Sequence, residues 1–222
     1  MNATRRTWMT AIAAITCFGL ILQFWVMVFG PAASGANRGR LIINYFSFFT
    51  ILTILTNLLI AVGLTSSLAA TNSRWRRFFA RPTTESATAV YIGIVGAAYS
   101  LLLRHLWNPQ GTQKLCDILL HDLVPVIYLA YWLVFVSKST LRWKDVVFWL
   151  PYPLVYFGYS LIRGAATGWY PYPFFDARSL GYSTVLANAA VLICAFLAVA
   201  LLLVAVGRWS GGKSAPFRRQ LH

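Results

Sequence analysis

Acidic residues are scarce in this sequence, and charge in general is low. Of its 222 residues, 5 are Asp or Glu and 19 are Lys or Arg, so charged residues make up 11% of the chain. A soluble domain carries about twice that share. The shortage of charge argues against a soluble globular protein and against a disordered chain, because both are rich in charged side chains.

Cysteine is also scarce, and its spacing excludes two further classes of protein. The three cysteines, Cys17, Cys116 and Cys194, lie far apart and form no Cys-x-x-Cys pair. A disulfide scaffold needs more cysteines, and a zinc site needs closely spaced ligands. His105 and His121 do not provide the paired histidines that hold haem in a membrane cytochrome. We therefore expect no metal ion and no other cofactor.

Apolar residues make up 59% of the chain and gather in six long runs. The runs cover residues 8–30, 41–64, 87–106, 115–136, 145–162 and 181–206, and each approaches the roughly 20 residues that a helix needs to cross a bilayer. The first run is too long for a cleaved signal peptide, so we interpret it as a retained anchor. The pattern predicts an all-α, polytopic membrane protein: one domain over residues 1–222, built as a bundle of six transmembrane helices, with residues 207–222 as a basic tail.

The distribution of basic residues predicts the orientation of this bundle. Thirteen of the 19 Lys and Arg residues lie in the N-terminal segment, the second and fourth connections and the C-terminal tail. Connections rich in Lys and Arg remain on the cytoplasmic side of a membrane, so we expect both termini in the cytoplasm. The basic residues that give the chain its formal net charge of +14 lie between the apolar runs and not on a separate polar domain. We therefore expect membrane lipids, and no nucleic acid, as partners; the oligomeric state stays open.

Ionisable residues within a bilayer are energetically costly, which makes them functional candidates. His121 lies near the start of the fourth run, with Asp117 four residues before it and Asp122 beside it. Residues four apart share one face of a helix, so Asp117 can hold one imidazole nitrogen and leave the other free to accept a proton. The alternative is an interfacial histidine that is bonded to a backbone carbonyl or to water.

The second run contains an unusual density of hydroxyl groups. Thr50, Thr53 and Asn57 fall at helical spacings of three and four, and Thr56 lies beside them. A threonine in a membrane helix often donates only to the carbonyl one turn earlier. A threonine oxygen can also attack an ester if a base removes its proton. The helical rise places Thr50 and Thr53 roughly 13 and 18 Å, and His121 about 9 Å, below the outer surface.

The connection before the sixth run has the sequence GWYPYPFFD. Pro171 and Pro173 disfavour helix at the residues before them, so we expect an extended segment. Its aromatic residues suit the membrane interface, and they could alternatively cover a cavity that is open to lipid tails. Tyr172 and Asn57 are candidate donors to an oxyanion.

Three motifs occur in an order that suggests a family. TILTNLL in the second run, LLHDLVP in the fourth and GWYPYPF before the sixth together resemble a bacterial family of six-span integral membrane proteins. That family is similar in turn to the animal androgen-induced membrane hydrolases. The resemblance covers nearly the whole chain, and each motif alone is short. It implies a location in the plasma membrane, here the bacterial inner membrane.

The animal relatives imply a threonine hydrolase that cleaves fatty acid esters of hydroxy fatty acids. Their essential histidine corresponds to His121, although the spacing to the following proline, Pro125, differs slightly. Their threonine corresponds to Thr53 when TILTNLL is aligned and to Thr50 when the preceding Phe-Phe-Thr-Ile is aligned; we favour Thr53. An acidic residue near their Tyr-Pro-Phe motif has its counterpart in Asp176.

These observations lead to competing hypotheses. The first is an intramembrane hydrolase of lipid esters, with Thr53 or Thr50 as nucleophile and His121 as base. The second is a non-catalytic carrier or channel for a small or lipidic solute, for which Pro151 and Pro153 would bend the fifth helix. A scaffold without a cavity is the third.

Overall fold

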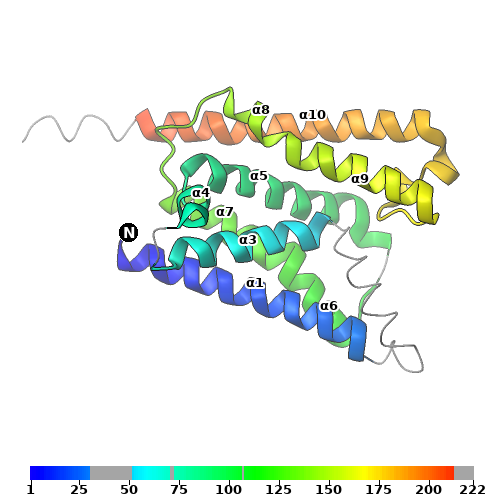
Figure 1. Cartoon of the computed structure of the whole chain (residues 1–222), viewed down its shortest axis with the longest axis horizontal. Helices are drawn as coiled ribbons and strands as arrows, with labels where there is room; N and C mark the ends of the chain where they lie inside the picture. Colours follow the sequence, from blue (N-terminus) through cyan, green and yellow to red (C-terminus); the bar gives the residue numbers. More distant parts are fainter. Residues whose placement is uncertain (31–51, 71–72, 107, 213–222) are drawn as a thin grey trace, which may run out of the picture. The chain divides into compact units, whose positions relative to one another are not determined.

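A computed structural model describes residues 1–30, 52–70, 73–106 and 108–212, and these residues form helices and connections without a strand (Figure 1). The chain divides into two compact units, residues 1–136 and 137–222. The predicted all-α class is confirmed.

Four of the described helices are long and apolar enough to cross a membrane. They are Ala3–Phe29, Pro82–Leu106, Gly111–Phe135 and Ala177–Trp209, and they coincide with the first, third, fourth and sixth predicted spans. Helices of this length and composition are stable when lipid surrounds them, because lipid tails solvate the apolar side chains and the helix satisfies its own backbone. The chain is therefore an integral membrane protein.

The second and fifth predicted spans take a different form. Residues 41–51 lie outside the described residues, and the second span continues as the apolar helix α3, Leu52–Leu68. The fifth consists of α8, Asp145–Trp149, and α9, Pro151–Thr167. The regular hydrogen bonding breaks at Leu150 because Pro151, the first residue of α9, has no N–H to donate. The count of six spans and the cytoplasmic termini stay predictions.

Unit 1 is built around α1, Ala3–Phe29, which lies alongside α3 and also packs on the helix of the fourth run (Figure 1). Helix α5, Pro82–Ala98, packs against α3 and against α7, Val124–Phe135. The short helix α4, Arg74–Phe79, joins α3 to α5. Small residues permit close approach of these helices: a Cβ at Gly96 of α5 would lie 3.1 Å from Pro125 of α7.

Two of the long helices widen into π-helical turns. In the third run, α5 continues as η2, Tyr99–Leu103, and a short 3₁₀ turn, η3, Arg104–Leu106. In the fourth, α6, Gly111–Ile118, continues as η4, Leu119–Leu123, before α7 begins. Pro125 gives a physical reason for η4, because its ring excludes the carbonyl one turn earlier from a normal helical position. Such turns are often found at functional sites.

Unit 2 contains α8, α9 and α10, Ala177–Gly212, and α10 is kinked at Gly181, whose φ of 74° and ψ of 155° are not helical. The connection between α9 and α10 was expected to be extended, and Tyr172 is extended with φ −137° and ψ 141°. The next three residues instead form the 3₁₀ turn η5, Pro173–Phe175. Asn188 of α10 donates to the Phe174 carbonyl at 3.0 Å, and this contact with α10 explains the departure from an extended chain.

Candidate functional site

Asp117 and His121 are in contact, as their spacing predicts. The Nδ1 atom of His121 lies 3.2 Å from the Asp117 carbonyl oxygen and 3.2 Å from its Oδ1. A carbonyl oxygen only accepts, so Nδ1 carries a hydrogen and the lone pair of the neutral ring lies on Nε2. The hydrogen bond of Nδ1 is thus to a backbone carbonyl, as in the alternative stated above, while Asp117 Oδ1 lies beside the same nitrogen without a hydrogen-bond partner among the described residues.

Tyr99 completes this group from the neighbouring helix. Its hydroxyl donates to Asp117 Oδ2 at 2.6 Å, and its ring stacks on the His121 imidazole with centroids 3.9 Å apart and planes at 21°. Tyr99 therefore holds both the carboxylate and the imidazole. We call Tyr99, Asp117 and His121 the histidine triad.

The side chains of the histidine triad are largely but not completely buried. The side chain of Asp117 is 8% exposed and that of His121 is 18% exposed. Within the described parts of the chain, Nε2 of His121 has no hydrogen-bond partner. An imidazole that donates from Nδ1 to a backbone carbonyl beside a carboxylate, with its lone pair at Nε2, is suited to accept a proton.

A second carboxylate lies at the edge of the triad and is neutralised. Arg104 forms an ion pair with Asp122, and its guanidinium carbon lies 5.2 Å from the centroid of the Tyr99 ring. The side chains of Arg104 and Asp122 are 48% and 34% exposed. Arg104 thus neutralises the negative charge of Asp122. The carboxylate that lies next to His121 Nδ1 is that of Asp117.

Asn57 connects the helix of threonines to the helix of the triad. Its buried Nδ2 donates to the Thr53 carbonyl at 2.9 Å and to the Leu120 carbonyl at 3.2 Å. In the i+5 pattern of η4 the partner of Leu120 would be Pro125, which has no N–H, so Asn57 supplies the missing donor. Both amide hydrogens of Asn57 are thereby used by backbone carbonyls, and none of the described residues donates to its Oδ1.

Two of the three threonines of the second run, Thr53 and Thr56, belong to α3. Thr53 is buried on α3, one turn before Asn57. The Asn57 side-chain amide donates to the Thr53 carbonyl and also to the carbonyl of Leu120, which precedes His121. Among the described hydrogen bonds, none joins Thr53 to His121. The buried hydroxyl of Thr56 donates to the Leu52 carbonyl at 2.7 Å, the common local contact of a membrane threonine. Thr50 lies outside the described residues.

Tyr172 and Asp176 belong to unit 2 and have local partners there. The Tyr172 ring stacks on Phe174 with centroids 5.1 Å apart and planes at 9°. Asp176 Oδ1 accepts a hydrogen bond from the backbone N–H of Arg178 at 2.9 Å, which caps the start of α10. These contacts show a structural use for both residues, and they do not connect them to the histidine triad.

Sequence reasoning missed Tyr99 and Arg104. Both come from the third run, whereas their partners Asp117 and Asp122 are each 18 residues later. A tyrosine inside an apolar run was a signal, since its hydroxyl needs a partner in lipid. In the part of the chain that the structure describes, no three His, Cys, Asp or Glu side chains gather as a metal site would require.

No model of a known protein family matches the chain, and neither does any curated protein or solved structure.

Proposed function

We propose that this integral membrane protein hydrolyses lipid esters within the bilayer, with His121 as the general base and a threonine of the second span as the nucleophile. The observation that supports the proposal is the histidine triad: within a helix long and apolar enough to cross a membrane, an imidazole is fixed at Nδ1, and its Nε2 has no hydrogen-bond partner among the described residues. Ionisable groups are expensive there and persist when they have a use.

The chemistry has two steps. His121 Nε2 removes the proton from a threonine hydroxyl, whose oxygen attacks the ester carbonyl; the imidazolium then gives that proton to the departing alcohol. A water molecule, deprotonated by the same nitrogen, attacks the acyl-threonine and releases the fatty acid, and the threonine regains its proton. Asp117 stabilises the imidazolium formed in each step, and Tyr99 fixes Asp117 through its hydroxyl.

The nucleophile is Thr53 or Thr50. Thr53 is favoured by its position on the turn of α3 that Asn57 ties to Leu120. Because no described hydrogen bond joins it to His121, proton transfer from Thr53 requires a bridging water or a tightening of the site around substrate, as is common for unliganded sites. Asn57 acts in this scheme as the link between the two helices, because its N–H groups are already donated.

A fluorophosphonate with an alkyl chain tests the proposal directly, since it forms a stable adduct with an activated hydroxyl. We expect labelling of the full chain in nanodiscs, with the adduct on Thr53 or Thr50, and loss of labelling in His121→Ala. Thr65→Ala is the matched control, because the Thr65 hydroxyl donates to the Ala61 carbonyl at 2.7 Å on the same helix. Labelling that persists in the double variant Thr53→Ala/Thr50→Ala would exclude a threonine nucleophile.

A carrier or channel is the alternative function. The interruption of regular hydrogen bonding between α8 and α9 at Leu150 supports it, because interrupted helices are common where transporters bind their substrates. Solute flux into proteoliposomes that is unchanged in His121→Ala, together with no ester hydrolysis, would favour this alternative.

A further inference from the structure

Helix α4 carries an unusual combination of side chains for a connection of this length. Its six residues, RWRRFF, begin after Ser73, whose Oγ accepts a hydrogen bond from the Arg76 N–H at 3.1 Å. Phe79 is buried, and a Cβ at Gly63 of α3 would lie 3.1 Å from its ring. Trp75 and Phe78 are 66% and 47% exposed. One aromatic residue thus anchors α4, and two project outward.

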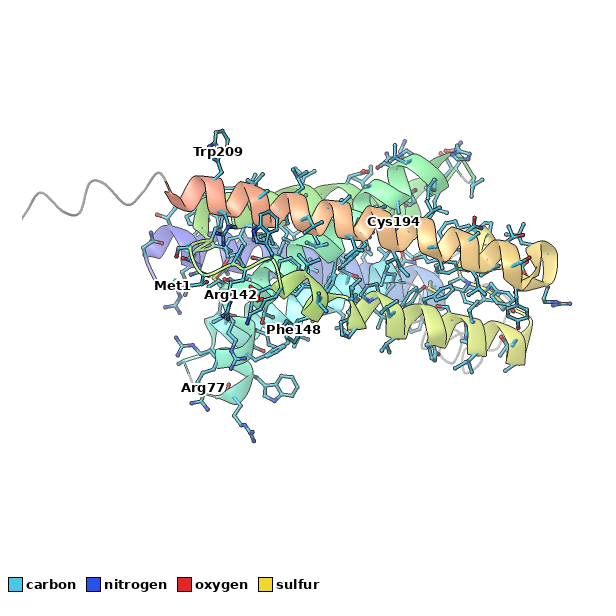
Figure 2. All side chains as sticks on the ribbon, turned by 90° about the horizontal axis from the view of Figure 1, so that it is seen from above. Met1, Arg77, Arg142, Phe148, Cys194 and Trp209 are labelled. Atoms are coloured by element: carbon cyan, nitrogen blue, oxygen red, sulfur yellow. The ribbon has the colours of Figure 1, made fainter. Side chains whose placement is uncertain are left out.

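The positive charge of this segment has no acidic side-chain partner among the described residues. Arg74, Arg76, Arg77 and Arg81 lie within eight residues, and Arg77 lies on the outer side of α4 (Figure 2). All five acidic residues of the chain are described, and each has another partner: Glu85 pairs with Arg5, Asp117 with His121 and Asp122 with Arg104, while Asp145 and Asp176 accept from the backbone N–H groups of Arg142 and Arg178. Four positive charges therefore need an external counterion.

The connectivity places this counterion at a membrane surface. Helix α4 begins six residues after α3 ends at Leu68, and α5 begins three residues after α4 ends. Helix α5 opens a helical stretch that is long and apolar enough to cross a membrane, and α3 is a shorter apolar helix, so we expect the short connection between them at the level of the lipid headgroups. Exposed Trp and Phe residues are stable at that level, and Arg binds phosphate through two parallel hydrogen bonds.

We infer that Arg74, Arg76, Arg77 and Arg81, with Trp75 and Phe78, form a binding surface for the headgroups of anionic phospholipids. The arginines bind the phosphates while the two aromatic side chains enter the headgroup region beside them. This surface is independent of the proposed hydrolase site.

Lipid retention by the full chain in detergent, counted by native mass spectrometry, tests the inference. We expect phosphatidylglycerol to be retained in preference to phosphatidylcholine, and Arg76→Gln/Arg77→Gln to lower the apparent affinity for phosphatidylglycerol about thirtyfold, since each basic residue at a membrane surface contributes about a fivefold factor. Arg76→Lys/Arg77→Lys keeps the charge and is expected to keep most of the preference. Inorganic phosphate should not displace the lipid.

Residues 142–144 offer a matched control with the sequence RWK. Arg142 and Lys144 are exposed, and Trp143 is 50% exposed but has the guanidinium of Arg208 5.9 Å from its ring. We expect Arg142→Gln/Lys144→Gln to lower the affinity clearly less than Arg76→Gln/Arg77→Gln does. An equal loss in this control would show that net charge alone attracts the lipid and would overturn the inference. Unchanged retention in Arg76→Gln/Arg77→Gln, or displacement of the lipid by single-stranded RNA, would also overturn it.

Discussion

Unit 1 contains two groups of buried ionisable residues, and they differ in what they leave unpaired. Near the start of α5, Arg5 Nη2 donates to both oxygens of Glu85, at 2.7 and 2.9 Å, and the Tyr131 hydroxyl donates to Glu85 Oε1 at 2.6 Å. About four helical turns later along the same helix, Tyr99 belongs to the histidine triad, in which Nε2 of His121 has no partner among the described residues.

The two groups use similar side chains for different ends. In the first, an arginine, a tyrosine and a carboxylate from three helices bind one another, and Glu85 is 4% exposed. A group in which the partners satisfy each other ties α1, α5 and α7 together. In the second, a tyrosine contacts both a carboxylate and an imidazole, and Nε2 of that imidazole has no hydrogen-bond partner in the part of the chain that the structure describes. The first arrangement stabilises the helix bundle, and the second is suited to chemistry.

The largest effect is expected from removing the available nitrogen. His121→Ala should lower the rate of ester hydrolysis about 10²–10⁴-fold, because a general base contributes that much to such reactions. The measurement is the steady-state turnover of a fluorogenic acyl ester by the full chain in nanodiscs. A turnover within threefold of the original chain would remove His121 from the reaction.

Removing the carboxylate of the first group should affect stability instead. Glu85→Ala leaves the part-buried Arg5 without its partner and is expected to lower the free energy of unfolding by about 3 kcal/mol. Unfolding in mixed micelles with increasing SDS measures this change. Arg104→Ala is the control: it breaks an exposed ion pair and should cost below about 1 kcal/mol. Equal losses in the two variants would contradict a special role for the Arg5–Glu85 pair.

The same substitution in both groups gives the sharpest comparison and the smallest effect. Tyr99→Phe keeps the stacked ring but removes the donor to Asp117, and hydrolysis should fall about tenfold, the equivalent of one hydrogen bond to a charged group. Tyr131→Phe removes a comparable hydrogen-bond donor from Glu85. It should lower the free energy of unfolding by about the amount that a tenfold change in rate represents, without slowing hydrolysis. If both variants slow hydrolysis alike, the two groups do not have separate functions.

Local spacing was enough to predict part of this structure. The contact of Asp117 with His121 follows from residues four apart on a helix, and four of the six apolar runs coincide with long apolar helices. These features depend on the order of residues within a single helix. Sequence patterns report such local relations well.

Relations between helices were beyond the same reasoning. Tyr99 reaches Asp117 from the preceding span, and its stacking on His121 depends on how two helices with π turns face each other. Asn57 was considered as a donor to an oxyanion, whereas the structure has it donating to Leu120 because Pro125 cannot. The turn at Pro173–Phe175 similarly depends on Asn188, 14 residues beyond its partner.

The wide turn at Leu119–Leu123 affects how this chain should be aligned with others. A π turn accommodates one residue more than an α turn, and one residue corresponds to a rotation of about 100° around a helix axis. Two proteins that differ by one residue between this histidine and the following proline can therefore present the imidazole in the same direction. Conversely, two proteins with identical spacing can present it on different faces if only one of them has the wide turn.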